Sequence, residues 1–236
     1  MPETAAETAF AAAAILDAWD ETPSLRAIRL DLGGERAARY ATPGQVLKLR
    51  SGGGESYFAL ASGPRAGGAG HAEILIKRGA PLADALIADA LKGAHVAASD
   101  PFGRGFPVDG ARGHDLMLFA AGSGIAPVRA LVQHVIAARA EFGRVELYYG
   151  QRAAGEFAYA REHAEWERAG VRVVLCASRP DGDWSGERGH VQDVARTTRL
   201  GAATIAFVCG MKGMIAGVRE TLGALGVPHE RIHLNY

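Results

Sequence analysis

The hydrophobic and polar positions along the chain follow two different patterns. In the first part, short apolar runs are separated by turn residues such as Gly33-Gly34 and Pro43-Gly44. The run LRAIRLDL (25–32) alternates apolar and polar residues, as a strand with one solvent-facing side should. Runs of this kind occupy residues 12–19, 25–32, 45–51, 56–62, 71–78 and 94–103. The pattern predicts a small antiparallel β-barrel, interrupted by one amphipathic helix over 81–93 that ends near Gly93.

From residue 115 onward, apolar strands alternate with longer amphipathic helices. The predicted strands are 115–121, 144–150, 171–178, 203–210 and 231–236, and the predicted helices are 127–143, 155–170, 190–201 and 212–226. This alternation is typical of a parallel sheet with helices on both faces. We therefore expect two domains, an all-β antiparallel barrel over 8–110 and an α/β domain with a five-stranded parallel sheet over 111–236.

Composition narrows the range of partners. The 26 basic and 26 acidic residues give a formal net charge of zero, which argues against nucleic acid as the main partner. Cys176 and Cys209 are the only cysteines, and each lies inside an apolar run, so neither an iron–sulfur cluster nor any other metal site is expected. The amino-terminal segment has acids where a signal peptide has bases, and its apolar run is too short to span a bilayer. We expect a cytoplasmic protein without a membrane span.

The predicted carboxyl ends of the parallel strands carry glycine and arginine. These ends read Gly122-Ser123-Gly124, Gly150-Gln151-Arg152, Ser178-Arg179 and Cys209-Gly210-Met211. Ligands of open parallel sheets bind beyond these ends, where glycine lets the backbone approach a ligand and helix amino ends favour anions. Any strand-to-helix turn favours glycine, but the agreement of four strand ends predicts a nucleotide diphosphate site.

The same motifs resemble a known family. GSGIAP (122–127), YYGQR (148–152), SRPDGDWSGERGHVQDV (178–194), CGMKGM (209–214) and the terminal HLNY are similar, in this order, to the pyridine-nucleotide domain of the ferredoxin–NADP reductase superfamily. Because the flavin domain of that superfamily is an antiparallel barrel, the resemblance covers nearly the whole chain. It implies a flavin-binding barrel that holds FAD, a second domain that binds NADH or NADPH, and hydride transfer from nicotinamide C4 to flavin N5.

The resemblance also implies roles for individual residues. Cys209 would lie at the nicotinamide and Tyr236 near the flavin ring, both as catalytic residues; read without the motifs, Cys209 is a small core residue and Tyr236 a frayed end. The implied nicotinamide-nucleotide-binding residues are Gly122, Ser123, Gly124, Ile125, Ala126, Pro127, Gly150, Arg152, Ser178, Arg179, Arg188, Gly210, Met211 and Met214. Pro127 is expected to begin its helix, because proline needs no N–H there.

The flavin motif of the superfamily is incomplete in this chain. The family has Arg-x-Tyr-Ser, an apolar residue, Ala or Ser, and Ser; here SYFALAS (56–62) puts Ser56, Phe58 and Ala59 at the arginine, tyrosine and serine positions. Loss of a charged contact costs about 1.5–3 kcal/mol, so we expect FAD to be held loosely. The expected FAD-binding residues are Phe58, Ala59, Leu60, Ala61, Ser62, Ile76, Lys77, Arg78 and Gly79, with the amino end of helix 81–93 at the pyrophosphate. The alternative is a plain buried strand at 57–62 and a solvated strand end at Lys77 and Arg78.

The choice of coenzyme and the function stay partly open. Arg179 and Arg188 favour NADPH, because arginine binds the 2′-phosphate, whereas SRPDGDW also resembles stretches of NADH-using relatives. The sequence predicts a flavin-dependent NAD(P)H oxidoreductase that passes electrons to a separate acceptor, either a protein or a small molecule. The alternatives are an electron-transfer subunit of a larger complex, and a non-catalytic nicotinamide-nucleotide-binding module with an empty barrel.

Overall fold

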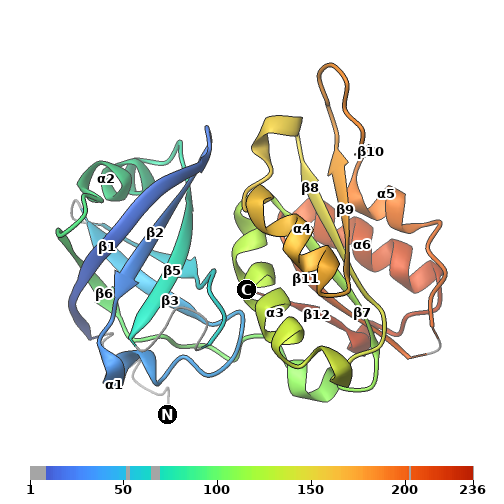
Figure 1. Cartoon of the computed structure of the whole chain (residues 1–236), viewed down its shortest axis with the longest axis horizontal. Coiled ribbons are helices and arrows are strands. Elements are labelled where there is room, and N and C mark those ends of the chain that lie inside the picture. Colours follow the sequence, from blue (N-terminus) through green and yellow to red (C-terminus); the bar gives the residue numbers. More distant parts are fainter. Residues whose placement is uncertain (1–8, 52–53, 65–69, 202, 236) are drawn as a thin grey trace, which may run out of the picture.

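The chain forms two sheets that lie side by side as two units (Figure 1). The computed structural model describes residues 9–51, 54–64, 70–201 and 203–235. Within these residues each unit contains one six-stranded sheet, the first antiparallel and the second parallel. This arrangement confirms the predicted fold class.

The first sheet closes on itself. Its strands are β1 (Phe10–Thr22), β2 (Leu25–Asp31), β3 (Val46–Ser51), β4 (Gly54–Ala59), β5 (His71–Lys77) and β6 (His95–Ser99), in the order β4-β3-β6-β1-β2-β5. A bridge between Leu60 and Ile74 joins the two edge strands, and the Ala61 N–H donates to the Glu73 carbonyl at 2.7 Å. Apolar side chains fill the interior, including Ile28, Leu47, Leu60 and Ile74.

Two helices accompany the barrel, α1 (Gly34–Ala37) and α2 (Pro81–Asp89). Pro81 occupies the first position of α2, where its missing N–H costs nothing. The helix ends at Asp89, earlier than the predicted end near Gly93. Gly93 has a φ of 88° and donates its N–H to the Ile15 carbonyl of β1 at 2.8 Å, so it directs the chain into β6 instead of capping the helix.

The second sheet contains the five predicted strands and one more. Its strands are β7 (Asp115–Ala121), β8 (Val145–Gln151), β9 (Val171–Ala177), β10 (Glu187–Arg188), β11 (Thr204–Cys209) and β12 (Ile232–Leu234), in the order β10-β9-β8-β7-β11-β12. The additional strand, β10, has two residues and pairs in parallel with β9. It was not predicted because two charged, exposed residues carry no apolar pattern.

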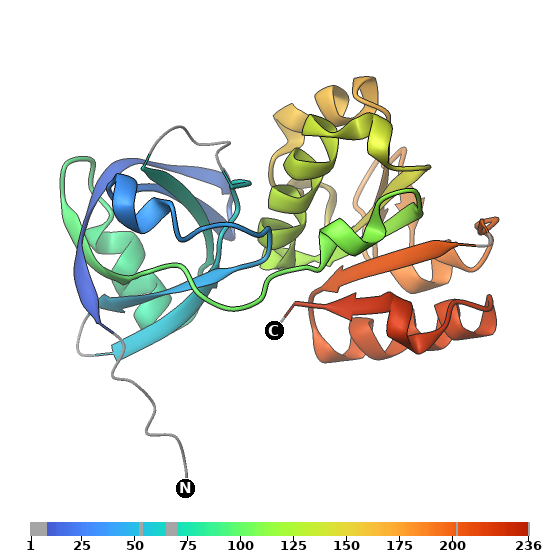
Figure 2. The ribbon, with the colours of Figure 1, turned by 90° about the horizontal axis from the view of Figure 1, so that it is seen from below.

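Helices cover both faces of this sheet (Figures 1 and 2). Alternate residues of β7 point to opposite faces of the sheet. Leu116 and Leu118 pack with residues of α3 (Ile125–Ala137) and α4 (Ala160–Arg168). Met117 and Phe119 pack with residues of α5 (Val191–Ala195) and α6 (Lys212–Ala224). Short 3-10 turns lie at η1 (Val108–Ala111), η2 (Gly122–Gly124), η3 (Arg139–Glu141), η4 (Ala154–Glu156) and η5 (His229–Arg231).

Helices α4 and α5 are shorter than predicted. Tyr159, directly before α4, has a left-handed φ of 59°, so the helix begins only at Ala160. Helix α5 ends at Ala195, within the polar run that leads to β11. No helix of the described residues is long and apolar enough to cross a membrane.

The segment between the two sheets is anchored on both. Figure 2 shows it running from the barrel along the near side of both units before it enters β7. Phe106 is fully buried in this segment and meets Phe207 of β11 edge to face, with ring centres 5.3 Å apart. Its main-chain N–H donates to the Pro43 carbonyl of the barrel at 2.7 Å. The connection therefore packs against both units.

Candidate functional site

A cleft lies between the barrel and the parallel sheet. Barrel residues line one wall, namely Tyr57, Phe58, Ala59, Leu75 and Lys77. Strand ends and the turn after β7 line the other, namely Ala121, Gly122, Ser123, Gly124, Ala126, Pro127, Cys209, Gly210 and Met211. The cleft has a volume of about 430 Å³. Phe58 and Cys209, which the resemblance assigns to different coenzymes, thus line the same cavity.

A second hollow continues from the cleft along the carboxyl ends of the parallel strands. It has a volume of about 750 Å³ and is lined by Lys77, Ala121, Gly122, Gly150, Gln151, Arg152, Ser178, Arg179, Gly189, His190, Val191, Gln192, Met211, Gly213 and Met214. The two spaces are contiguous, because four residues line both of them: Lys77, Ala121, Gly122 and Met211. The hollow has the size of known small-molecule sites and contains two exposed guanidinium groups, those of Arg152 and Arg179.

The glycines of the turn after β7 serve two different purposes. Gly122 has a φ of 59°, a left-handed conformation in which glycine has no steric penalty. At Gly124, a Cβ atom would lie 2.4 Å from the Cys209 carbonyl oxygen, so only glycine lets the ends of β7 and β11 come this close. Helix α3 begins at Ile125, two residues before the predicted start at Pro127. Proline is still tolerated at its third position, because the first four N–H groups of a helix have no intrahelical partner.

Comparison with known proteins agrees with this geometry. Residues 118–220 match the oxidoreductase NAD-binding domain family. The gamma subunit of sulfhydrogenase 1 from Pyrococcus furiosus is 28% identical over 197 residues, which cover 80% of this chain and 66% of that protein. The chain has the two-domain fold of ferredoxin–NADP reductase-like proteins.

Several solved structures share the whole two-domain fold. A ferredoxin NADP+ reductase from Neisseria gonorrhoeae with bound FAD and NADP matches with a TM-score of 0.81 at 22% identity, over 97% of this chain and 98% of that one. The CS-b5R domains of human Ncb5or match with a TM-score of 0.82 at 19% identity, over 100% of this chain and 72% of that one. The fruit protein pKIWI502 of Actinidia deliciosa is 37% identical over 91 residues, which cover 37% of this chain and 29% of that protein. The chain thus spans less than two thirds of the length of these curated relatives.

Cys209 stands at the end of β11 with its side chain largely buried. Burial raises the pKa of its thiol to about 12. The thiol is therefore neutral at physiological pH. Such a group can contact a ligand in the cleft but is a poor nucleophile.

Tyr149 anchors the turn after β7, a role that the sequence did not reveal. Its hydroxyl donates to the Gly122 carbonyl at 3.4 Å, and it accepts from Gln151 Nε2 at 2.8 Å and from the Ala158 N–H at 3.2 Å. The side chain is fully buried, and burial raises the pKa of Tyr149 well above its usual range. A neutral hydroxyl thus links the ends of β7 and β8 at the shared part of the two hollows.

The barrel side has a suitable wall for a flat ring but a poorer diphosphate site. Arg78 forms an ion pair with Asp20 at 2.6 Å and does not line the cleft. The Gly79 N–H, expected to face pyrophosphate at the amino end of α2, donates instead to Asp84 Oδ1 at 3.0 Å. A carboxylate thus occupies this helix end. Lys77 is exposed and lines both hollows, so it contributes a positive charge to them.

Several predicted site residues lie elsewhere. The side chains of Leu60, Ala61, Ile76 and Ile125 are fully buried in the hydrophobic cores, and Ser62 Oγ accepts from the Glu73 N–H at 3.0 Å. Arg188 lines a separate hollow together with Tyr148, Arg172 and Asp193, so it is not brought together with Arg179. Tyr236 lies outside the described residues. Among those residues no group of three or more His, Cys, Asp or Glu side chains could hold a metal ion.

Some lining residues are not among the predicted site residues. Tyr57 occupies the unspecified position of the flavin motif, yet it is 61% exposed at the mouth of the cleft and meets Phe102 edge to face. Leu75, Gln151, His190 and Gln192 also line the two hollows. Gln151, His190 and Gln192 lie within the quoted motifs at 148–152 and 178–194, whereas Leu75 becomes a neighbour only through the fold.

Proposed function

We propose that this chain is a flavin-dependent NAD(P)H oxidoreductase that passes electrons from a nicotinamide nucleotide through FAD to a separate acceptor. The observation that carries this proposal is the cleft in which Phe58 of the barrel and Cys209 of the parallel sheet share one cavity, contiguous with the hollow along the strand ends. We assign residues 8–110 to the FAD-binding domain and residues 111–236 to the NAD(P)-binding domain.

The barrel wall would hold the flavin. Tyr57, Phe58 and Ala59 offer a largely apolar surface for the ring system, and Lys77 offers a positive charge to the diphosphate. When bound, FAD supplies an acceptor for the hydride of a reduced nicotinamide. Because the guanidinium of the family motif is replaced and Asp84 occupies the amino end of α2, we expect FAD affinity below that of members with the full motif.

The strand ends of the parallel sheet would hold the nicotinamide nucleotide. The turn at Gly122–Gly124 leaves its backbone accessible, and Arg152 and Arg179 contribute positive charge to phosphate groups. Cys209 and Gly210 face the cleft and would pack against the nicotinamide, keeping water from the reacting atoms. The neutral thiol of Cys209 positions the ring without taking part in proton transfer.

The experiment that tests this proposal loads the purified protein with FAD and mixes it anaerobically with NADH or with NADPH. We expect the flavin absorbance to bleach with at least one of the two coenzymes. If neither nucleotide reduces the loaded flavin, the oxidoreductase proposal is wrong. Equilibrium dialysis with FAD and with each nucleotide then distinguishes a non-catalytic module, which binds a nicotinamide nucleotide but no flavin.

A second candidate is an electron-transfer subunit of a larger complex. Two matched relatives are named as components of such complexes, one of sulfhydrogenase 1 and the other of the Na+-translocating NADH-quinone reductase of Mannheimia succiniciproducens. In this case the flavin of the isolated chain should bleach when a nicotinamide nucleotide is added. The chain should nevertheless pass electrons only slowly to small oxidants. Copurification of a tagged chain with a redox partner at constant stoichiometry would favour this second role.

A further inference from the structure

We propose that Arg129 is a positioning residue that fixes the barrel against the α/β domain and so sets the separation of the two walls of the coenzyme cleft. Only the expected effect on the rate of flavin reduction rests on the proposed function. Arg129 lies on α3, two residues after Pro127, and is 8% exposed. It is not among the residues that line the cleft, so it would act through the segments it joins.

The guanidinium of Arg129 contacts both units at once. On the barrel side it donates to the Ala61 carbonyl at 2.9 Å and to Glu73 Oε1 at 3.1 Å. On the other side it forms a two-pronged contact with Glu162 of α4, with Nε and one terminal nitrogen at 2.8 and 2.7 Å from the two carboxylate oxygens. A planar guanidinium with five donors can satisfy all these acceptors in one fixed orientation, which a lysine cannot do.

The ion pair between Arg129 and Glu73 is buried, so the Glu73 carboxylate depends on its charged partners. The Glu73 side chain is 4% exposed and lies within ion-pair distance of Arg129 and, at 3.5 Å, of Arg29. Burial raises the pKa of the Glu73 carboxyl, so its ionised form depends on these two guanidinium groups. A buried carboxylate that loses its partner is strongly destabilised, and the two units are therefore held in the one arrangement that keeps Glu73 and Arg129 together.

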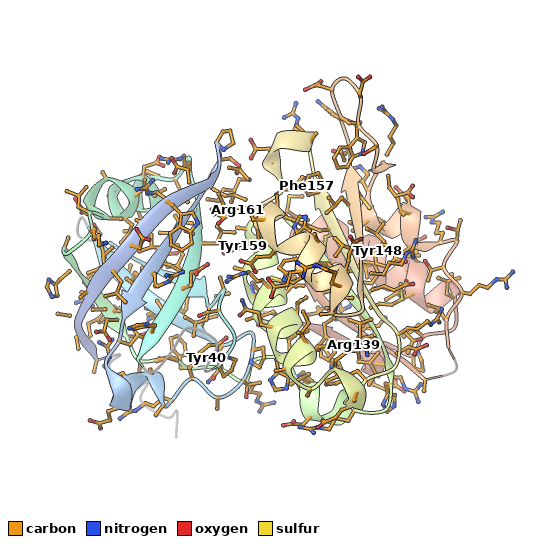
Figure 3. The ribbon with its side chains drawn as sticks, viewed as in Figure 1. Tyr40, Arg139, Tyr148, Phe157, Tyr159 and Arg161 are labelled. Carbon is orange, nitrogen blue, oxygen red and sulfur yellow. The ribbon has the colours of Figure 1, made fainter. Side chains whose placement is uncertain are left out.

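A second layer of contacts surrounds the ion pair. The Arg129 guanidinium lies 4.3 Å from the ring centre of Tyr159, which Figure 3 shows where α4 approaches the barrel. The Tyr159 N–H donates to Glu21 Oε2 of β1 at 2.8 Å. One turn after Arg129, Gln133 Oε1 accepts from the Gly63 N–H of the barrel at 2.7 Å. These contacts restrict the same interface around the central guanidinium.

The segments joined by Arg129 are those that carry the cleft. Ala61 follows Phe58 and Ala59 on the same chain segment, and Glu73 lies two residues before Leu75. Arg129 itself lies on α3, the helix that begins directly after the Gly122–Gly124 turn. A shift at the ion pair would therefore displace one cleft wall relative to the other, while each wall keeps its own structure.

Hydride transfer depends steeply on the separation of donor and acceptor, and a displacement of about 1 Å can cost about 100-fold in rate. We expect Arg129→Met to lower the rate of flavin reduction at saturating nicotinamide nucleotide by about 10- to 100-fold. Binding of FAD to the barrel and of the nucleotide to the sheet should change little, because each site retains its own residues. Arg129→Lys should restore only part of the rate.

The matched control is Arg144→Met. Arg144 donates to Asp115 Oδ2 at 3.1 Å and to the Arg199 carbonyl at 2.8 Å, so it makes similar contacts within the α/β unit alone. This variant should reduce flavin at the rate of the unmodified protein. A double variant, Arg129→Met with Glu73→Gln, removes the uncompensated carboxylate and provides a folded protein if the single variant unfolds; its flavin reduction should remain slow.

A readout without coenzymes tests the same proposal. Spin labels at Leu91→Cys of the barrel side and Glu220→Cys of α6 report the distance between the two units. We expect a narrow distance distribution in the unmodified chain and in the Arg144 variant. In Arg129→Met and in the double variant we expect a broader or shifted distribution. Unchanged distances would overturn the proposal, as would flavin reduction at the original rate in the double variant. If the unmodified chain reduces no flavin, the proposed function fails, and the distance distributions still decide the role of Arg129.

Discussion

Phe58 of β4 and Cys209 of β11 line one cleft although they belong to different sheets. Their proximity is a product of domain packing, because each residue lies at or near the end of a strand whose sheet faces the other unit. The close fit of Gly124 against the Cys209 carbonyl sets the position of one wall, and the buried contacts of Arg129 set the position of the other. The site therefore depends on residues that need not touch a coenzyme.

Gly124→Ala tests the first of these contacts. The new Cβ would lie 2.4 Å from the Cys209 carbonyl oxygen, so the ends of β7 and β11 must separate. We expect the free energy of unfolding in urea to fall by about 1–3 kcal/mol, together with weaker binding of the nicotinamide nucleotide. The control is Gly223→Ala in α6, where no described atom lies within 4 Å of the added Cβ; it should be neutral or stabilising by up to about 1 kcal/mol. Equal stabilities of the two variants would contradict the packing role of Gly124.

Arg179→Gln tests whether the end of β9 distinguishes NADPH from NADH. A charged contact to the 2′-phosphate contributes about 1.5–3 kcal/mol, so NADPH affinity should fall by about 10- to 150-fold while NADH affinity changes much less. Isothermal titration with each coenzyme measures the difference. Arg188→Gln is the matched control, because Arg188 lines a separate hollow and its loss should leave both affinities unchanged. An equal loss of affinity for both coenzymes in the Arg179 variant would show that this guanidinium does not read the 2′-phosphate.

Asp84→Asn tests whether the Asp84 carboxylate weakens the binding of FAD. The Asp84 carboxylate accepts from the Gly79 N–H at the amino end of α2, where it repels a diphosphate. Removing its charge should tighten FAD binding by about two- to five-fold, measured by flavin fluorescence, and leave riboflavin binding unchanged. Asp89→Asn at the other end of α2, where Asp89 accepts from Ser51 Oγ at 3.0 Å, is the control. Unaltered FAD affinity in the Asp84 variant would place the diphosphate elsewhere.

His163 makes the stability of the α/β unit dependent on pH. Burial lowers the pKa of this imidazole below its ordinary value of 6.5. The stability that it contributes is complete above 6.5 and is lost as the pH falls through the lower value of the folded state. His163→Gln should therefore lose less unfolding free energy than the unmodified chain between about pH 7 and pH 5. Identical pH profiles for His163→Gln and the unmodified chain would contradict this account.

The fold was largely predictable because it follows from local patterns. Alternating and continuous apolar runs located all six barrel strands and five of the parallel strands, and the glycine turn after 115–121 indicated a site at a strand end. Strand β10 and the starts of α3 and α4 were missed. They depend on pairing with β9, on the 3-10 turn at Gly122–Gly124 and on the left-handed φ of Tyr159, which leave no apolar pattern.

The candidate site was less predictable because tertiary contacts decide which charges are available. Arg78 is a plausible phosphate ligand in the sequence, but the structure pairs it with Asp20. Arg188 is separated from Arg179 by its position in β10. Conversely, Arg129 carries no motif of its own, and its burial between Glu73 and Glu162 follows only from the packing of α3 against the barrel.

The most direct test of the shared cleft is a kinetic isotope measurement on direct hydride transfer. The FAD-loaded protein is mixed anaerobically, in a stopped-flow instrument, with reduced nicotinamide nucleotide that carries either hydrogen or deuterium at the transferred C4 position. If the two coenzymes meet in the cleft between Phe58 and Cys209, deuterium should slow flavin bleaching several-fold at saturating nucleotide. Bleaching at the same rate with the hydrogen-carrying and the deuterium-carrying nucleotide, or no bleaching with either of them, would contradict the account.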